Sequence, residues 1–231
     1  MREPINVSGM VLSASPVGEY DKRVVILTRE LGKITAFARG ARRMKSPLMA
    51  VSNPFVFGEF QVYEGRDSYT LSGANIKEYF LDLAQMQPGV YYGFYFLELA
   101  EYFGQEGNDE TQMLNLLYVT MNAIRRGKQD LRLVRCIFEL RTITISGEAP
   151  QMFSCMECGT KENLTVFSLR DSAIYCPKCG RTIKDPWPLQ PGTVLACRYI
   201  IAAPLAKLYG FTVNEEILDE LERLLRAYPV S

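Results

Sequence analysis

Apolar and polar side chains alternate with a period of two along much of the first 80 residues, which is the pattern of half-buried β-strands. Five such stretches are separated by short polar turns: 5–15, 22–29, 33–39, 54–65 and 68–76. Gly58 lies inside the fourth stretch and indicates a β-bulge. Five short strands with a bulging glycine predict a small closed barrel of the OB type. An SH3-like barrel or an open meander would give the same pattern.

The apolar period lengthens to that of a helix after residue 76. Residues 77–103 carry apolar and aromatic side chains at helical spacing, with a break at Pro88, and are expected to pack in the core of a helix bundle. Three more helices are expected, the first and last beginning at capping boxes: 109–126, 129–145 and one that begins at 212–215. We therefore predict an α+β protein with an OB domain over residues 1–80 and a helical domain over residues 81–231.

Two pairs of cysteines interrupt the helical region with the spacing C-x₂-C-x₁₇-C-x₂-C, formed by Cys155, Cys158, Cys176 and Cys179. Two thiolates two residues apart on a tight turn can occupy two corners of a tetrahedron, and a second turn completes it. Gly159 and Gly180 follow the two pairs and are expected to take left-handed conformations there. The spacing predicts a zinc knuckle within residues 151–187, inserted in the helical domain, with a small hairpin between its turns.

This predicted metal site is structural rather than catalytic. Four thiolates close the zinc shell, whereas a catalytic zinc keeps one position open for water or substrate. We therefore expect one structural Zn²⁺ per chain. The two remaining cysteines, Cys136 and Cys197, lie in apolar helical patterns and are expected in the core.

Composition narrows the possible functions. The chain has 231 residues, 48% of them hydrophobic, and no visible secretory signal or membrane-spanning stretch, which predicts a cytoplasmic globular protein. It contains no histidine, which excludes catalysis by Ser-His-Asp or Cys-His groups. It also lacks the glycine-rich motifs that bind nucleotide phosphates. We therefore expect a protein that is not an enzyme.

The formal net charge is zero, but the charge is unevenly distributed. Residues 1–80 hold 11 Lys and Arg against 8 Asp and Glu, whereas residues 81–150 hold 6 against 9. The most concentrated basic stretch is "ARGARRMKSP", in which Arg39, Arg42, Arg43 and Lys45 have no acidic residue between them. Such charges repel one another unless an anion is present.

The same stretch joins the third and fourth predicted strands, near one end of the barrel, where OB folds bind single strands of nucleic acid. We predict contacts from this loop to phosphates that do not depend on sequence. Lys22, Arg23 and Lys33 are expected to add to its field, and Phe37 to provide a stacking platform. The alternative is an ordinary solvated loop.

A second basic cluster spans the junction of two predicted helices and consists of Arg125, Arg126, Lys128, Arg132 and Arg135. Solvated helix ends are the simpler interpretation, because cations are favourable near a helix C-terminus. The functional interpretation is a dock for an acidic peptide or for DNA.

The order of these features resembles the RecO family of bacterial recombination mediators over essentially the whole chain. The similarity rests on "GKITAFARGARRMKS", on "NPFVFGEFQVYEG" and on the cysteine pairs that precede a helical end. The family's basic loop corresponds to Arg39, Arg42, Arg43 and Lys45, and its zinc ligands to the four cysteines named above. The resemblance implies binding of single- and double-stranded DNA, annealing of complementary strands, and help in loading recombinase onto coated single strands.

The resemblance also implies partners and a location. The expected partners are RecR and the acidic C-terminal tail of single-strand-binding protein, and the expected location is the bacterial cytoplasm, at the nucleoid. The helix-junction cluster is the candidate site for the tail. Two other functions fit the residues: a zinc-ribbon adaptor of transcription or translation that binds protein or RNA, and a thiol–disulfide redox enzyme that uses the cysteine pairs.

Overall fold

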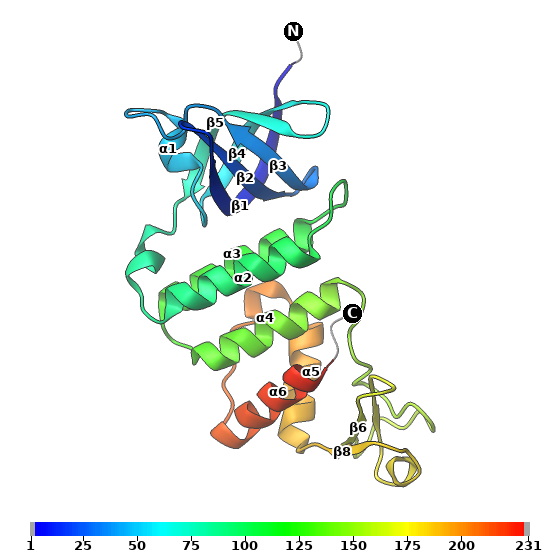
Figure 1. Ribbon diagram of the computed structural model, residues 1–231. Helices are drawn as coiled ribbons and strands as arrows, with labels where there is room; N and C mark the ends of the chain where they lie inside the picture. The colour runs from blue at the N-terminus through cyan, green and yellow to red at the C-terminus, as the bar shows by residue number, and fades with distance from the viewer. Residues whose placement is uncertain (1–2, 229–231) are drawn as a thin grey trace. The chain divides into compact units, whose positions relative to one another are not determined.

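The computed structural model describes residues 3–228 of the chain (Figure 1). The chain divides into two compact units, Met1–Arg125 and Arg126–Ser231. None of the helices within residues 3–228 has the length and apolar character that crossing a bilayer requires.

The first unit is built on a closed barrel of five strands (Figure 1). The strands are β1 (Ile5–Val17), β2 (Asp21–Thr28), β3 (Gly32–Ala38), β4 (Phe57–Glu64) and β5 (Tyr69–Glu78). Their order around the barrel is β1-β2-β3-β5-β4, and β4 pairs with β1 to close it. The β3–β5 pair is parallel and the other pairs are antiparallel. This architecture confirms the OB-type barrel that the alternating pattern predicts.

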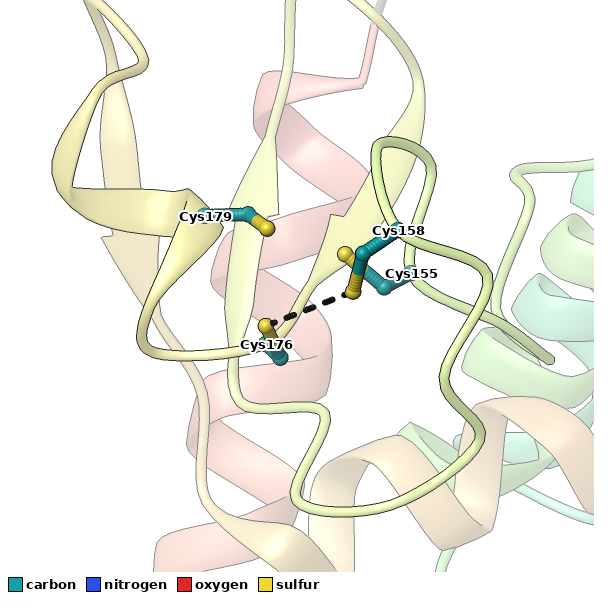
Figure 2. Close-up of side chains that lie close together, drawn as sticks. All are labelled: Cys155, Cys158, Cys176 and Cys179. Carbon is teal, nitrogen blue, oxygen red and sulfur yellow. Dashed lines mark hydrogen bonds between the residues drawn. The ribbon is translucent and has the colours of Figure 1, made fainter.

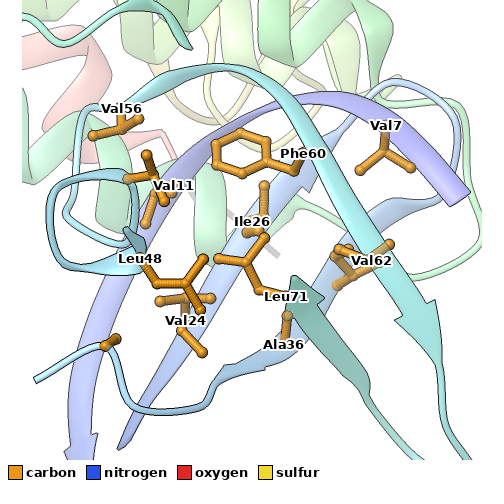
Figure 3. Close-up of a cluster of buried hydrophobic side chains, with 14 residues drawn as sticks. Val7, Val11, Val24, Ile26, Ala36, Leu48, Val56, Phe60, Val62 and Leu71 are labelled. Carbon is orange, nitrogen blue, oxygen red and sulfur yellow. The ribbon is translucent and has the colours of Figure 1, made fainter. Parts of the chain in front are cut away.

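Apolar side chains from all five strands fill the barrel (Figure 3). In strand β3 the alternation of residue types matches the alternation of burial. Ile34, Ala36 and Ala38 point inward, while the residues between them are only half-buried. The bulge expected at Gly58 is present, since the register of β4 against β5 shifts between Phe57 and Gly58. A short helix, α1 (Leu48–Val51), contributes two more buried side chains to this core.

Two helices of the first unit follow a 3₁₀ turn at Leu81–Gln85: α2 (Gly89–Phe103) and α3 (Thr111–Arg126). Helix α2 packs against β1 and β2. The approach is close directly after the helix, at Gly104. A Cβ added to this glycine would lie only 3.0 Å from a methyl carbon of Leu27 in β2. Helix α2 also faces α3, since a side chain on Gly93 would begin 3.8 Å from the sulfur of Met121. The helix therefore packs between α3 and the barrel rather than only among helices, because β1 and β2 are apolar on their outer face as well as on the inner one.

The second unit combines three helices with a small sheet. The helices are α4 (Leu131–Ile145), α5 (Pro191–Ala202) and α6 (Glu215–Ala227), and α4 packs against both of the others. The sheet contains β6 (Val166–Ser168), β7 (Ala173–Tyr175) and β8 (Pro186–Pro188), with 3₁₀ turns at Cys179–Arg181 and Leu205–Lys207. The last helix begins at Asn214, whose side chain accepts a hydrogen bond from the backbone of Ile217 at 2.9 Å. The cap is therefore Asn214 and not the earlier threonine of the expected capping box.

Candidate nucleic-acid interface and metal site

The basic loop, residues 39–47, connects β3 to α1 and is fixed at its base. Ala41 is fully buried in the barrel core. The backbone N–H of Gly40 donates to the carboxylate of Asp21 at 2.7 Å, and the backbone N–H of Arg42 donates to the carbonyl of Tyr20 at 2.8 Å. These bonds attach the loop to the turn between β1 and β2, so that its backbone is held in one conformation.

Four cations project from this fixed backbone, and all four side chains are exposed: Arg39, Arg42, Arg43 and Lys45. The guanidinium of Arg42 donates to the carbonyl of Gly18 at 3.3 Å, and that of Arg43 stacks over Tyr20 with its carbon 5.0 Å from the ring centroid. In the part of the chain that the structure describes, none of the four forms a salt bridge with a carboxylate. Their charges are therefore available to an external anion.

Two residues of β2 lie beside the basic loop. The ammonium of Lys22 donates to the side-chain oxygen of Asn53 at 2.7 Å. Burial, and then the positive charge of Arg42, lower the pKa of Lys22. The guanidinium of Arg23 approaches the hydroxyl of Thr35 in β3 at 3.4 Å. The structure thus brings Lys22 into the electrostatic field of the loop.

The outer face of the barrel carries a row of side chains that starts near the loop. Phe37 is the register partner of Arg23 on one side and of Thr70 on the other, and Thr70 is the partner of Tyr63. Ala36 and Ala38 beside Phe37, and Val62 beside Tyr63, point into the core, so these two rings lie on the outside. Phe37 is half-buried and Tyr63 is 38% exposed. Sequence reasoning missed Tyr63, although its place next to the buried Val62 gave the necessary signal.

Lys33 is not brought to the basic loop. It lies at the opposite end of β3, five residues before Ala38. Its ammonium donates to the backbone carbonyl of Glu101 in α2 at 2.6 Å. In this structure the residue connects the barrel to a helix of its own unit.

The cluster predicted at the helix junction is not one free basic surface. Arg125, at the end of the first unit, donates to Glu78 at 3.0 and 3.2 Å and also contacts Asp82. Its hydrogen bonds lower the pKa values of both carboxyls. Arg126 and Lys128 are exposed, and within residues 3–228 neither forms a salt bridge.

The other two arginines of this cluster are engaged inside the second unit. Arg132 and Arg135 both donate to the carboxylate of Glu222 in α6, at 2.6 Å in each case. Glu222 is only 8% exposed, and its hydrogen bond with Arg132 is the main cause of its lowered pKa. These residues hold α4 against α6, an arrangement that no local sequence pattern could reveal.

The four predicted metal ligands come together (Figure 2). Their sulfur atoms all lie within 4.8 Å of one another, and those of Cys158 and Cys176 are 3.9 Å apart. Sulfurs bound to one tetrahedral Zn²⁺ at about 2.3 Å would be roughly 3.8 Å apart, so the arrangement fits this ion. Cys155 and Cys176 are buried, whereas Cys158 is exposed.

The two turns that carry the cysteines are built differently. Gly159 has a φ of +72°, as expected for a left-handed turn residue. Gly180 lacks a positive φ, so the predicted left-handed conformation was wrong for this residue. The glycine is required by close packing instead, because a Cβ there would lie 2.7 Å from Val166 in β6. The hairpin expected between the turns is present as β6 and β7, with β8 as a third strand.

The backbone and the neighbouring thiols shift the pKa values of individual cysteines in this cluster in different directions. The backbone N–H of Cys179 is the main cause of the lowered pKa of Cys176. Burial and the three other sulfurs raise the pKa of Cys179 to about 12. Four thiolates in one shell repel one another, and a bound cation would remove that repulsion.

Comparisons with known proteins cover nearly the whole chain. The family model "Recombination protein O N terminal" matches residues 1–80, and "Recombination protein O C terminal" matches residues 89–229. The chain is similar to "DNA repair protein RecO" of Alkaliphilus metalliredigens, with 32% identity over 97% of this chain and 92% of the relative. Proteins of the same name from Acetivibrio thermocellus and Bacillus subtilis are 29% and 28% identical, over 97% and 95% of this chain and 90% and 86% of the relatives.

Proposed function

The chain belongs to the RecO family of DNA repair proteins, and we propose that it is a non-enzymatic recombination mediator that binds single- and double-stranded DNA through the phosphate backbone. The observation that supports this most directly is the basic loop, on which four exposed cations have no carboxylate partner among residues 3–228. Lys22 and Arg23 extend the positive region onto β2. Arginine and lysine bound to phosphates provide affinity that depends on salt and not on sequence.

We further propose that a single strand crosses the outer face of the barrel from the loop. Phe37 and Tyr63 lie on this face and offer rings on which bases can stack, which any base tolerates. A strand held chiefly by its phosphates keeps the pairing edges of its bases free. Two strands held in this way can find their complement, which accounts for annealing without an enzymatic step.

Binding to labelled oligonucleotides of two unrelated sequences tests this proposal. We expect affinities at low salt that agree within about threefold, because phosphate contacts do not read bases. A duplex should compete for the same protein. No measurable binding at low salt would refute the DNA role and favour an adaptor that binds protein.

We propose that the second unit recruits this activity to coated single strands, through RecR and the acidic C-terminal tail of single-strand-binding protein, and so helps to load recombinase at the bacterial nucleoid. Arg126 and Lys128 are the exposed cations of the predicted dock. Arg132 and Arg135 donate hydrogen bonds to Glu222, and they would have to break these bonds before they could bind the tail. Titration with a tail peptide tests this assignment. We expect Arg126→Ala/Lys128→Ala to weaken binding, and equal affinity would move the dock elsewhere.

We propose one structural Zn²⁺ at the four cysteines. They would hold it in a closed thiolate shell, and the ion would supply cross-linking of the two turns rather than chemistry. The segment between the turns contains only three-residue strands, so metal binding worth about 10–16 kcal/mol at the peptide scale would fix its fold. Metal analysis after dialysis should find one zinc per chain, and Cys176→Ser should lose it. Retention of zinc by that variant would refute the ligand set.

A further inference from the structure

The tip of the basic loop carries an apolar side chain. Met44 is 88% exposed, a larger fraction than for any other large hydrophobic residue in the described part of the chain. Its neighbours in sequence are Arg43 and Lys45, both exposed. A single exposed methionine is common on protein surfaces, so exposure alone assigns no role.

The backbone around Met44 is held in a defined turn. The N–H of Ser46 donates to the carbonyl of Arg43 at 3.1 Å, which makes Met44 and Lys45 the two central residues. Lys45 has a φ of +63°, a left-handed conformation that residues other than glycine adopt rarely. The turn therefore places Met44 and Lys45 together at the tip of the loop.

Both ends of the loop are anchored, so this tip is carried on a rigid base. Ala41 on one side and Leu48 on the other are buried in the barrel core. The N–H of Arg43 donates to the carbonyl of Gly40 at 3.0 Å, which forms a first turn before the one at the tip. An apolar group on such a base keeps its position when a ligand pushes against it.

The charge around this tip identifies the kind of ligand. The nearest cations along the loop would bind phosphates on either side of Met44, since none of them has a carboxylate partner within residues 3–228. Proteins that bind the minor groove of DNA with arginine and lysine often insert an apolar side chain, methionine included, between neighbouring bases. We propose that Met44 enters the base stack of bound DNA and separates two adjacent bases. This inference rests on the DNA-binding function proposed above.

Such a wedge has a defined use in annealing. A single strand whose adjacent bases are held apart at one step is locally extended there, and it presents the pairing edges on either side of that step to a second strand. Met44 would do this at the loop while the cations hold the strand by its phosphates. The side chain reads no base, because a thioether offers neither a strong donor nor a strong acceptor.

Fluorescence of a single strand of adenines carrying one 2-aminopurine tests the wedge, because this base becomes brighter when it is unstacked. The wild-type protein should raise the fluorescence at saturation, and Met44→Leu, which keeps the apolar bulk, should do the same. Met44→Ala should lose the rise. Met49→Ala is the matched control, since Met49 is 40% exposed on α1 and should have no effect.

The salt dependence of binding separates the two proposals. Met44→Ala removes no phosphate contact, so its log–log salt slope should equal that of the wild type. Wild-type binding with no rise in fluorescence, or an equal rise with Met44→Ala, would overturn the wedge and leave the DNA-binding proposal intact. Failure of the wild type to bind DNA would overturn both.

Discussion

The guanidinium of Arg43 lies over the ring of Tyr20, so that the basic loop rests on the turn between β1 and β2. The same turn accepts the backbone N–H of Arg42 at the carbonyl of Tyr20. A single aromatic residue thus supports two of the four candidate phosphate contacts, although it carries no charge and was not singled out by its sequence.

Replacing this ring should weaken DNA binding. Tyr20→Leu removes a cation–π contact of about 0.5–1 kcal/mol, so we expect single-strand affinity to fall about twofold to fivefold. Tyr20→Phe keeps the ring face and should bind like the wild type. Fluorescence anisotropy at fixed salt gives both affinities, and equal affinities for Leu and Phe would show that the stack does not support the loop.

The pKa of Lys22 reports the field of the loop. Its value is lowered by burial and then by the charge of Arg42, so Arg42→Ala should raise it toward that of an ordinary lysine. Nuclear magnetic resonance of the carbon next to the ammonium follows this titration. Arg66→Ala, an exposed arginine in the turn between β4 and β5, should leave it unchanged. An equal response to both variants would contradict the contact.

The lowered pKa of Lys22 also predicts a pH dependence. Lys22 loses its proton at a lower pH than an exposed lysine, so its contribution to phosphate binding should decline earlier as pH rises toward the ordinary value of 10.5. Bound phosphate should raise the pKa of Lys22 again. A titration in the presence of DNA that shows no upward shift would place Lys22 outside the interface.

Glu222 should stabilise the second unit in a pH-dependent way. Its pKa is lowered in the folded state, so its contribution is present above the unfolded pKa and is lost as pH falls through the folded value. Glu222→Gln should lower the free energy of unfolding by about 2 kcal/mol at neutral pH, because Arg132 and Arg135 each lose their most buried charged partner, although Arg132 keeps Glu215 and Asp219 and Arg135 keeps Glu139. The one tryptophan, Trp187, lies in this unit and reports unfolding in urea.

The control for this prediction is Glu216→Gln on the exposed face of the same helix. That variant should change stability by less than about 0.5 kcal/mol. If the loss for Glu222→Gln is equally small, or if it does not diminish in acid, the carboxylate does not hold α4 and α6 together.

The six cysteines should fall into two reactivity classes. Cys136 and Cys197 are fully buried, and burial raises both pKa values to about 12, so they should resist alkylation until the protein unfolds. The four clustered cysteines should react only after a chelator is added. Mass spectrometry should therefore find no modified thiol in the native protein, four after a chelator is added, and six in denaturant. Rapid loss of the clustered thiols without chelator would argue against bound metal.

Local patterns in the sequence were sufficient where the determining contacts are local. Alternation around Ile34 and Ala36 predicted β3 to within a residue, and the cysteine spacing predicted the metal site because each pair lies on one turn. Contacts between distant segments could not be found in this way. The pairing of Arg125 with Glu78 joins residues 47 positions apart, and that of Arg132 with Glu222 joins residues 90 apart. In both pairs an arginine that the sequence offers as a binding residue forms an ion pair within its own unit.

Helix α5 shows a second limit. Its residues are apolar on several sides and begin with Pro191, so they present no clear helical stripe or capping side chain. The apolar residues of β1 and β2 on both faces could likewise be understood only once α2 was seen to cover one face. Where a distant element covers the outer face of a strand, the residues on that face are apolar as well. The alternation of polar and apolar residues that predicts a strand is then lost.

The salt dependence of single-strand binding tests the central claim most directly. Arg42→Ala/Arg43→Ala/Lys45→Ala removes three proposed phosphate contacts and should flatten the log–log slope by about 2, at roughly 0.7 per contact. Lys161→Ala/Lys184→Ala/Lys207→Ala removes the same charge from exposed positions in the second unit and should leave the slope as it is. A slope for the loop variant equal to that of the wild type would contradict the assignment of the basic loop to DNA.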